Sequence, residues 1–147
     1  MSELLDLALR AHGGLDRWRK FSKVSATIVS GGGLLPMKGS ELPRSPAGTA
    51  TIATTREQST VISSFGQSDW RMVFRPDQVL VETTAGHVVQ ERRNPRAAFA
   101  GHTLTTPWDL LHRAYFSGYA RWTYLNTPFL LAMPDIEVAD RTVAGGR

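Results

Sequence analysis

The sequence predicts an α+β fold in which a curved antiparallel sheet is covered by helices. Apolar residues recur at helical spacing near the N-terminus and again after residue 106. Between these stretches, short segments alternate apolar and polar residues, and turn signals separate them at intervals of about 8–12 residues. That spacing favours an antiparallel meander over βαβ units. The length of 147 residues suits a single domain over residues 1–147.

Two short helices are expected at the N-terminus. Ser2 is a suitable N-cap for the first helix, and Gly13-Gly14 ends it. A second helix is expected over Leu15–Phe21, with its large apolar residues Leu15, Trp18 and Phe21 facing inward. The first helix is expected to present one apolar stripe, formed by Leu4, Leu5, Ala8, Leu9 and His12.

From Lys23 onward, apolar residues recur at every second position instead of at helical spacing. Val24, Ala26 and Ile28 alternate with the residues between them, which predicts a half-buried strand. The stretch from Leu34 to Gly48 is rich in proline and glycine and predicts a long loop or an interrupted edge strand. Further strands are expected at Thr49–Arg56, Gln58–Ser64, Trp70–Arg75, Gln78–Thr84, His87–Arg92 and Ile136–Val138.

The strongest local signal is the segment Thr106-Pro107-Trp108-Asp109. It offers a threonine N-cap, a proline at the first helical position and an acid at the third, which is a capping-box arrangement. The helix is expected to run to about Ser117-Gly118. Tyr119–Asn126 and Pro128–Ala132 are expected to add shorter helical or irregular pieces.

Two segments carry a resemblance to a known family. Residues 11–18, Ala-His-Gly-Gly-Leu-Asp-Arg-Trp, precede a basic linker and the first strand. They resemble the opening of LolA-like proteins, which are bacterial lipoprotein carriers and their lipoprotein-sorting relatives. Residues 94–102 and 106–112, which include Asn94-Pro95-Arg96 and Thr106-Pro107-Trp108, are similar to bacterial proteins that share this opening. The resemblance covers Leu4 to about Pro134.

The resemblance implies an incomplete antiparallel half-barrel with helices over its mouth. Because the chain is shorter than the usual members of that family, we expect it to lack the C-terminal strands of a full half-barrel. An unclosed sheet leaves edge N–H and C=O groups free to pair with another chain. A homodimer through the exposed sheet edge is therefore expected.

Composition excludes several classes of function. The chain has no cysteine, so disulfides, cysteine-ligated zinc and iron–sulfur clusters are ruled out, and no cofactor is expected. No apolar run reaches the length of about 18 residues that a membrane span needs. The N-terminus lacks the pattern of a secretory signal, which favours the cytoplasm, or the periplasm if a leader was removed. The net charge of +4 comes with no nucleic-acid-binding motif, so no nucleic-acid partner is expected.

Asp109, His112 and His102 are the candidates for catalysis. Asp109 and His112 lie three residues apart on a predicted helix, so their side chains can meet. The carboxylate could fix the histidine tautomer for general-base catalysis, with His102 nearby in the preceding loop. The interpretation that we favour over catalysis is a structural role, in which Asp109 caps the helix and His112 fills a polar place in the packing. No metal site is expected, because the histidines do not follow metal-binding spacings.

Aromatic residues are concentrated between residues 108 and 129. One helix cannot bury all of them on a single face. The segment is therefore expected to form a packed lid, a ligand cavity or an oligomer interface. The aromatic residues concerned are Trp108, Tyr115, Phe116, Tyr119, Trp122, Tyr124 and Phe129.

These observations predict non-catalytic binding of a hydrophobic or amphipathic ligand, such as a lipid or an acyl chain, between the sheet and the helical lid. One alternative is a small hydrolase of an apolar ester or lactone that uses His112 and Asp109. Another is a truncated, self-associating domain without activity. The residues expected to contact the ligand are Trp70, Met72 and Phe74 on the sheet and Trp108, Leu111, Tyr115, Tyr119 and Trp122 on the lid.

Overall fold

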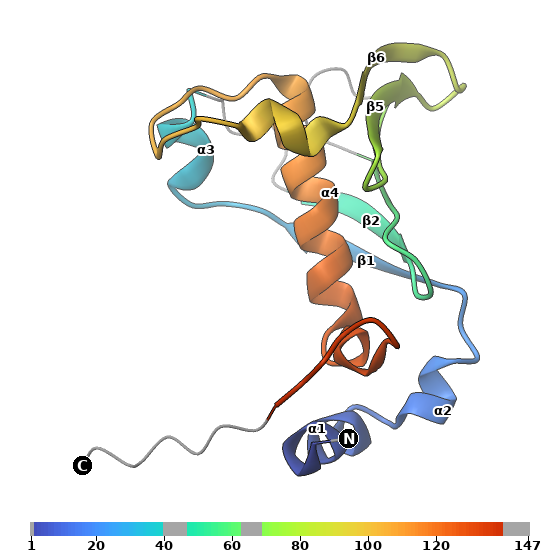
Figure 1. Cartoon of the computed structure of the whole chain (residues 1–147). Helices are drawn as coiled ribbons and strands as arrows, with labels where there is room; N and C mark the ends of the chain where they lie inside the picture. The colour runs from blue at the N-terminus through green and yellow to red at the C-terminus, as the bar shows by residue number, and fades with distance from the viewer. Residues whose placement is uncertain (1, 40–46, 63–68, 140–147) are drawn as a thin grey trace. The chain divides into compact units, whose positions relative to one another are not determined.

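The computed structural model describes residues 2–39, 47–62 and 69–139 (Figure 1). The chain divides into two compact units. We call Met1–Ser22 with Asn126–Arg147 the terminal unit, and Lys23–Leu125 the sheet unit. The expectation of one domain over residues 1–147 stays a prediction.

Short helices form the terminal unit. α1 (Glu3–Ala11), α2 (Leu15–Trp18) and the 3-10 helix η2 (Phe129–Ala132) are its regular elements among the described residues. Ser2 caps α1 as predicted, because its Oγ accepts a hydrogen bond from the backbone N–H of Leu5 at 3.2 Å. The predicted helical piece after Pro128 is confirmed by η2.

The terminal unit buries a narrower apolar stripe than predicted. Leu5 and Leu9 pack against Phe129, which also stacks on Trp18 at 4.3 Å between ring centroids. Leu4 of the predicted apolar stripe, however, is 64% exposed, and the buried residues of the stripe are Leu5 and Leu9. α2 ends at Trp18 and leaves Phe21 exposed, contrary to the predicted inward orientation. The partners of α1, which come from α2, from η2 and from the segment after η2, cover only its i, i+4 row, Leu5 and Leu9.

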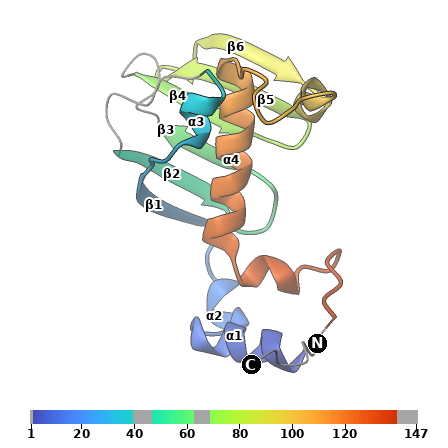
Figure 2. The same cartoon turned by 90° about the vertical axis from the view of Figure 1, so that its left-hand side faces the viewer.

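Six antiparallel strands form the sheet, and their order in space is their order in the chain. The predicted meander is therefore confirmed, and β1 and β6 are its edges (Figure 2). The alternation predicted for β1 is also present, with Val24, Ala26 and Ile28 half-buried and their neighbours exposed. The strands are β1 (Lys23–Val29), β2 (Ala47–Ala53), β3 (Ser59–Ile62), β4 (Trp70–Phe74), β5 (Gln78–Thr83) and β6 (Val88–Arg93).

Two predicted segments have a different structure. Leu34–Met37 is a short helix, α3, rather than a loop or an edge strand. Pro36 fits there because it lies in the first turn, where a backbone N–H has no partner within the helix. Ile136–Val138 does not form a strand; the backbone N–H of Ile136 instead donates to Met133 in a turn, at 3.1 Å. Residues 40–46 of the predicted loop and 63–64 of the third predicted strand lie outside the described residues.

The long helix α4 (Leu110–Asn126) begins later and ends later than predicted. Thr106 is not its N-cap, because the Thr106 Oγ1 accepts a hydrogen bond from the backbone N–H of Thr103 instead. Asp109 caps the helix, since its Oδ1 accepts from the backbone N–H of His112 at 2.8 Å. Gly118 lies inside the helix and does not end it.

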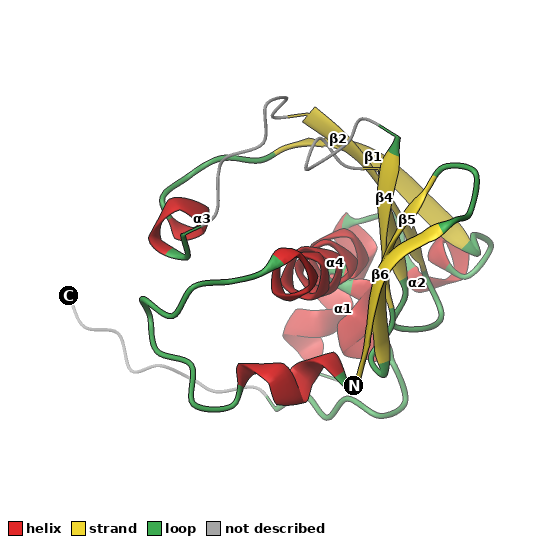
Figure 3. Ribbon diagram, turned by 90° about the horizontal axis from the view of Figure 1, so that it is seen from above, coloured by secondary structure: helices red, strands yellow, loops and turns green. Residues whose placement is uncertain are grey.

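α4 lies across one face of the sheet, and α3 lies on the same side (Figure 3). Two hydrogen bonds fix α4 on the strands. Ser59 Oγ donates to the carbonyl oxygen of Gly118 at 2.9 Å, and Trp122 Nε1 donates to that of Ala53 at 3.1 Å. The buried core between them comprises Ala50, Met72, Val79, Val81, Leu111 and Ala114.

These observations confirm the α+β fold class, with a curved antiparallel sheet and covering helices. Among the described residues, the helices are too short or too polar to cross a membrane.

Candidate ligand-binding site

The structure divides the eight residues predicted to bind a ligand among several places. Met72, Phe74, Leu111 and Trp122 are buried in the contact between the sheet and α4. Trp70 packs, half-buried, against the same core. These five residues therefore hold α4 on the sheet.

The other three predicted residues lie toward the edges of this contact. Tyr115 and Tyr119 face a pocket beside α4, and their rings stack at 6.2 Å between centroids. Trp108 precedes the helix, and the ammonium of Lys38 lies 5.1 Å above its ring. The eight residues thus do not surround one cavity.

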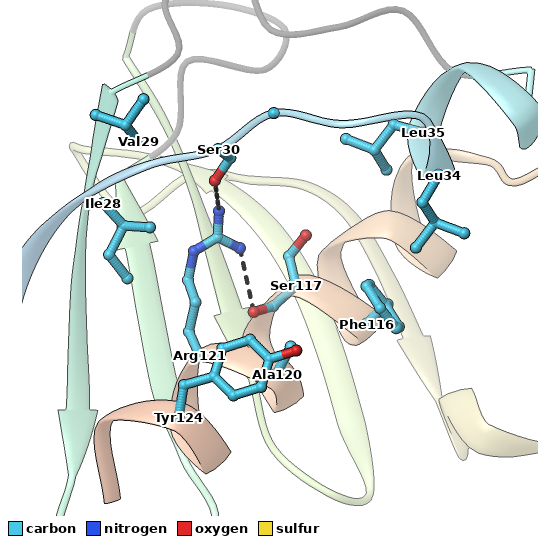
Figure 4. A pocket seen from close by; sticks show the side chains of 11 residues that line it. Ile28, Val29, Ser30, Leu34, Leu35, Phe116, Ser117, Ala120, Arg121 and Tyr124 are labelled. Carbon is cyan, nitrogen blue, oxygen red and sulfur yellow. Dashed lines mark hydrogen bonds between the residues drawn. The ribbon is translucent and has the colours of Figure 1, made fainter. Parts of the chain in front are cut away.

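A pocket of about 310 Å³ lies between β1, α3 and α4. We call it the α3–α4 pocket (Figure 4). It opens to solvent and its walls are mostly apolar, contributed by the end of β1, both leucines of α3 and one face of α4. The lining residues are Ile28, Val29, Ser30, Gly31, Leu34, Leu35, Phe116, Ser117, Ala120, Arg121 and Tyr124.

The spacing of residues along α4 explains why this helix has a second apolar face. Phe116, Ala120 and Tyr124 are four residues apart and form one row, which lines the pocket. Leu111, Ala114 and Trp122 point instead toward the strands and are buried there. The large aromatic content of this segment is thus shared between a core face and a pocket face.

Arg121 is the charged residue in the wall of this pocket. Its guanidinium donates from Nη1 to the carbonyl oxygen of Ser117 and from Nη2 to Oγ of Ser30, both at 3.1 Å (Figure 4). No carboxylate of the described residues lies within ion-pair distance of it. Burial lowers the pKa of Arg121. Because an arginine side chain does not lose its proton in proteins, a positive charge stays in the wall.

A second pocket, of about 380 Å³, lies on another side of α4. We call it the tyrosine pocket; Tyr115, Tyr119, Phe99, Phe116, Glu57 and Arg96 line it. Burial raises the pKa of Tyr115, Arg96 opposes that rise, and Tyr119 and Glu57 add to it. The tyrosine pocket is lined by one acid, Glu57, and one cation, Arg96, so its charges balance. The α3–α4 pocket is lined by the cation Arg121 and by no acid.

The structure brings Asp109, His112 and His102 together. Nδ1 of His112 lies 2.9 Å from Oδ1 of Asp109, and Nε2 donates to the carbonyl oxygen of Ala98 at 3.1 Å. The ring of His102 lies 4.9 Å from that of His112, between centroids. The predicted contact between Asp109 and His112 is therefore present.

The surroundings of this cluster favour a structural role. Both nitrogens of the buried His112 ring face partners of this chain, and neither lines a pocket described above. Burial by itself would raise the pKa of Asp109. Hydrogen bonds from Arg92 and from the His112 backbone, together with the charges of both residues, lower it to about 2. The hydrolase alternative stays a prediction.

No group of three or more metal-ligating side chains is found among residues 2–39, 47–62 and 69–139. The rings of His102 and His112 are tilted by 46° with their centroids 4.9 Å apart, and Asp109 is paired with Arg92.

Sequence reasoning missed the α3–α4 pocket because α3 was not predicted. One signal was available: Arg121 is flanked by Tyr119, Ala120 and Trp122, and a single cation in such a stretch marks a charge beside apolar surface. Phe116 and Tyr124 were noted only as members of the aromatic segment.

We find no match to this chain among known protein families, curated proteins or solved structures.

Proposed function

We propose that this protein binds a small hydrophobic or amphipathic ligand, such as an acyl chain, in the α3–α4 pocket and does not transform it. The observation that carries the proposal is the pocket itself, an apolar cavity of about 310 Å³ between a sheet edge and two helices. Ligand pockets are usually concave, mostly apolar and roughly 300–1,000 Å³ in volume. A small number of polar groups among apolar walls, here Ser30, Ser117 and Arg121, is also typical of such sites.

The LolA-like resemblance supports the same class of ligand. A curved open sheet with helices on one face is the arrangement that the resemblance implies. That family includes lipoprotein carriers, and an acyl chain is the simplest ligand that such apolar walls would favour. Burial of apolar surface would supply about 25 cal/mol per Å².

Binding of N-phenyl-1-naphthylamine, a neutral apolar dye whose fluorescence rises in apolar surroundings, tests the proposal. In the Ala120→Trp variant the indole would occupy the α3–α4 pocket, so the dye is expected to bind at least tenfold more weakly. Ala97→Trp is the matched control, because Ala97 is exposed on the 3-10 helix η1 (Pro95–Phe99) and lines neither pocket. Equal binding by all three proteins, or by none, would reject the proposal.

Self-association through the sheet edge is a second candidate. The observation in its favour is that β6 is an edge strand with Val88 55% exposed. An exposed apolar edge invites pairing with another strand, and a lysine there discourages it. Sedimentation velocity of the wild type and of Val88→Lys tests the idea: a dimer that the substitution converts to a monomer supports it, and a monomeric wild type rejects it.

A further inference from the structure

Arg121 is a cation whose bonding capacity is only partly used. A guanidinium has five N–H donors. In Arg121, one nitrogen donates to Ser117 within α4 and another to Ser30 after β1. Both acceptors are neutral oxygens. No further acceptor for Arg121 is found among the described residues, and the side chain lines the pocket.

Two other arginines of the sheet unit have a carboxylate partner, whereas Arg121 has none among the described residues. Arg92 pairs with Asp109, and Arg71 with Glu82, in each case with a nitrogen–oxygen distance of 2.5 Å. Removing a charge from water is costly unless the charge is paired. A ligand that brings its own negative charge would therefore recover energy at Arg121 that no described residue supplies.

Arg121 and two serines form a polar part of the pocket wall, with apolar residues on either side of it. Ser30, Ser117 and Arg121 lie together, with Leu34, Leu35 and Phe116 on the α3 side of them and Ile28 and Val29 of β1 on the other side (Figure 4). An amphipathic molecule matches this arrangement, with its charged group at Arg121 and its chain toward α3.

We infer that the ligand is a carboxylate with an aliphatic chain, and that Arg121 binds its headgroup; this inference rests on the function proposed above. One guanidinium balances one carboxylate, and the planar fork of the two groups allows paired hydrogen bonds. A phosphate monoester carries a charge of about −1.5 to −2 at neutral pH and would keep an excess negative charge. The pocket thus selects a monocarboxylate over a neutral or doubly charged amphiphile.

Isothermal titration calorimetry with octanoate, octanol and octyl phosphate tests this inference. The three probes share one chain and differ in the headgroup. For the wild type we expect octanoate to bind at least tenfold more tightly than either of the others. In Arg121→Met we expect octanoate to lose about 10- to 100-fold, the range for a lost hydrogen bond to a charged group, while octanol changes less than about threefold.

Two further variants make the result specific. Arg96→Met removes the cation of the tyrosine pocket and should leave octanoate binding unchanged. Arg121→Lys keeps the positive charge but loses the planar guanidinium, so we expect a loss of octanoate affinity between those of the wild type and Arg121→Met. If circular dichroism shows Arg121→Met to be unfolded, Arg121→Lys takes its place in the comparison.

The possible failures are distinguishable. Equal binding of octanol and octanoate would overturn the carboxylate inference and leave the proposed function standing. Tighter binding of octyl phosphate, or loss of octanoate binding in Arg96→Met, would also overturn it. Absence of binding by all three probes would reject both the inference and the proposed function.

Discussion

Gly118 of α4 lies directly against Phe74 of β4. A Cβ atom at residue 118 would lie 2.3 Å from Cβ of Phe74, far inside van der Waals contact. Glycine is therefore required at this point for the helix to approach the strand. The close approach also places the carbonyl oxygen of Gly118 within hydrogen-bonding distance of Ser59.

We expect Gly118→Ala to destabilise the protein. In a helix, alanine is more stable than glycine by about 1 kcal/mol, but overpacking a core costs roughly 1–3 kcal/mol and occasionally more. The cost of the clash with Phe74 should therefore exceed the gain in helix propensity. Urea unfolding followed by circular dichroism measures the difference. Gly33→Ala is the control, since no atom lies within 4 Å of a Cβ there and its φ is negative, at −85°. A Gly118→Ala protein as stable as the control would contradict the packing described here.

Ser59→Ala should cost about 1 kcal/mol of unfolding free energy, because it removes a buried hydrogen bond between β3 and α4. Ser25→Ala is the matched control. Its hydroxyl bonds Thr51 on an exposed surface, so the loss should stay under about 0.5 kcal/mol. The same urea titration compares them, and equal losses would show that the Ser59 bond does not fasten the helix.

Asp109 should make stability depend on pH in acid. Its pKa is about 2 in the folded protein, below the usual value of 3.8. The contribution of the ionised Asp109 side chain to the free energy of unfolding is therefore complete above about pH 4 and disappears as the pH falls through 2. Because the side chain is 50% exposed, solvent screening limits it to roughly 1 kcal/mol.

Thermal unfolding between pH 2 and 6 checks this dependence. Asp109→Asn should be less stable than the wild type at pH 6 and should approach it at pH 2. Asp16→Asn, which removes an acid from an exposed pair with Arg19, should follow the wild type throughout. A constant difference between Asp109→Asn and the wild type across this range would count against the Asp109 interactions described.

The affinity for fatty acids should rise with chain length until the pocket is full. Each buried methylene contributes about 0.8 kcal/mol, or roughly fourfold in affinity. The pocket is near the lower limit of ligand-site volumes. We therefore expect the affinity to rise from hexanoate to decanoate and to level off for chains longer than decanoate. Calorimetry across the series measures the slope. An affinity independent of chain length would mean that the chain stays in water.

The sheet could be predicted from the sequence because its order follows from local signals. Alternation in β1 and the short turns before and after β5 left few ways to pair the strands other than as a meander. The contact between Asp109 and His112 was also predictable, since it depends on spacing within one helical turn.

The ends of α4 and the pocket could not be predicted, because they depend on contacts between distant segments. Gly118 has the local character of a helix end, yet Phe74 on another strand explains its place inside the helix. The Lys38 backbone, at the end of α3, accepts a hydrogen bond from Trp108 N–H, which helps to keep residues before Leu110 out of the helix. Arg121 became a candidate only when Ser30 was found beside it.

The most direct test of a binding site in the α3–α4 pocket is isotope-filtered NMR of the labelled protein with unlabelled octanoate. We expect nuclear Overhauser contacts from the octanoate chain to the methyl groups of Ile28, Leu34 and Leu35, and a shift of the Arg121 Nε–H resonance. Contacts to Tyr115 and Tyr119 in their place, or no contacts at saturating octanoate, would contradict this expectation.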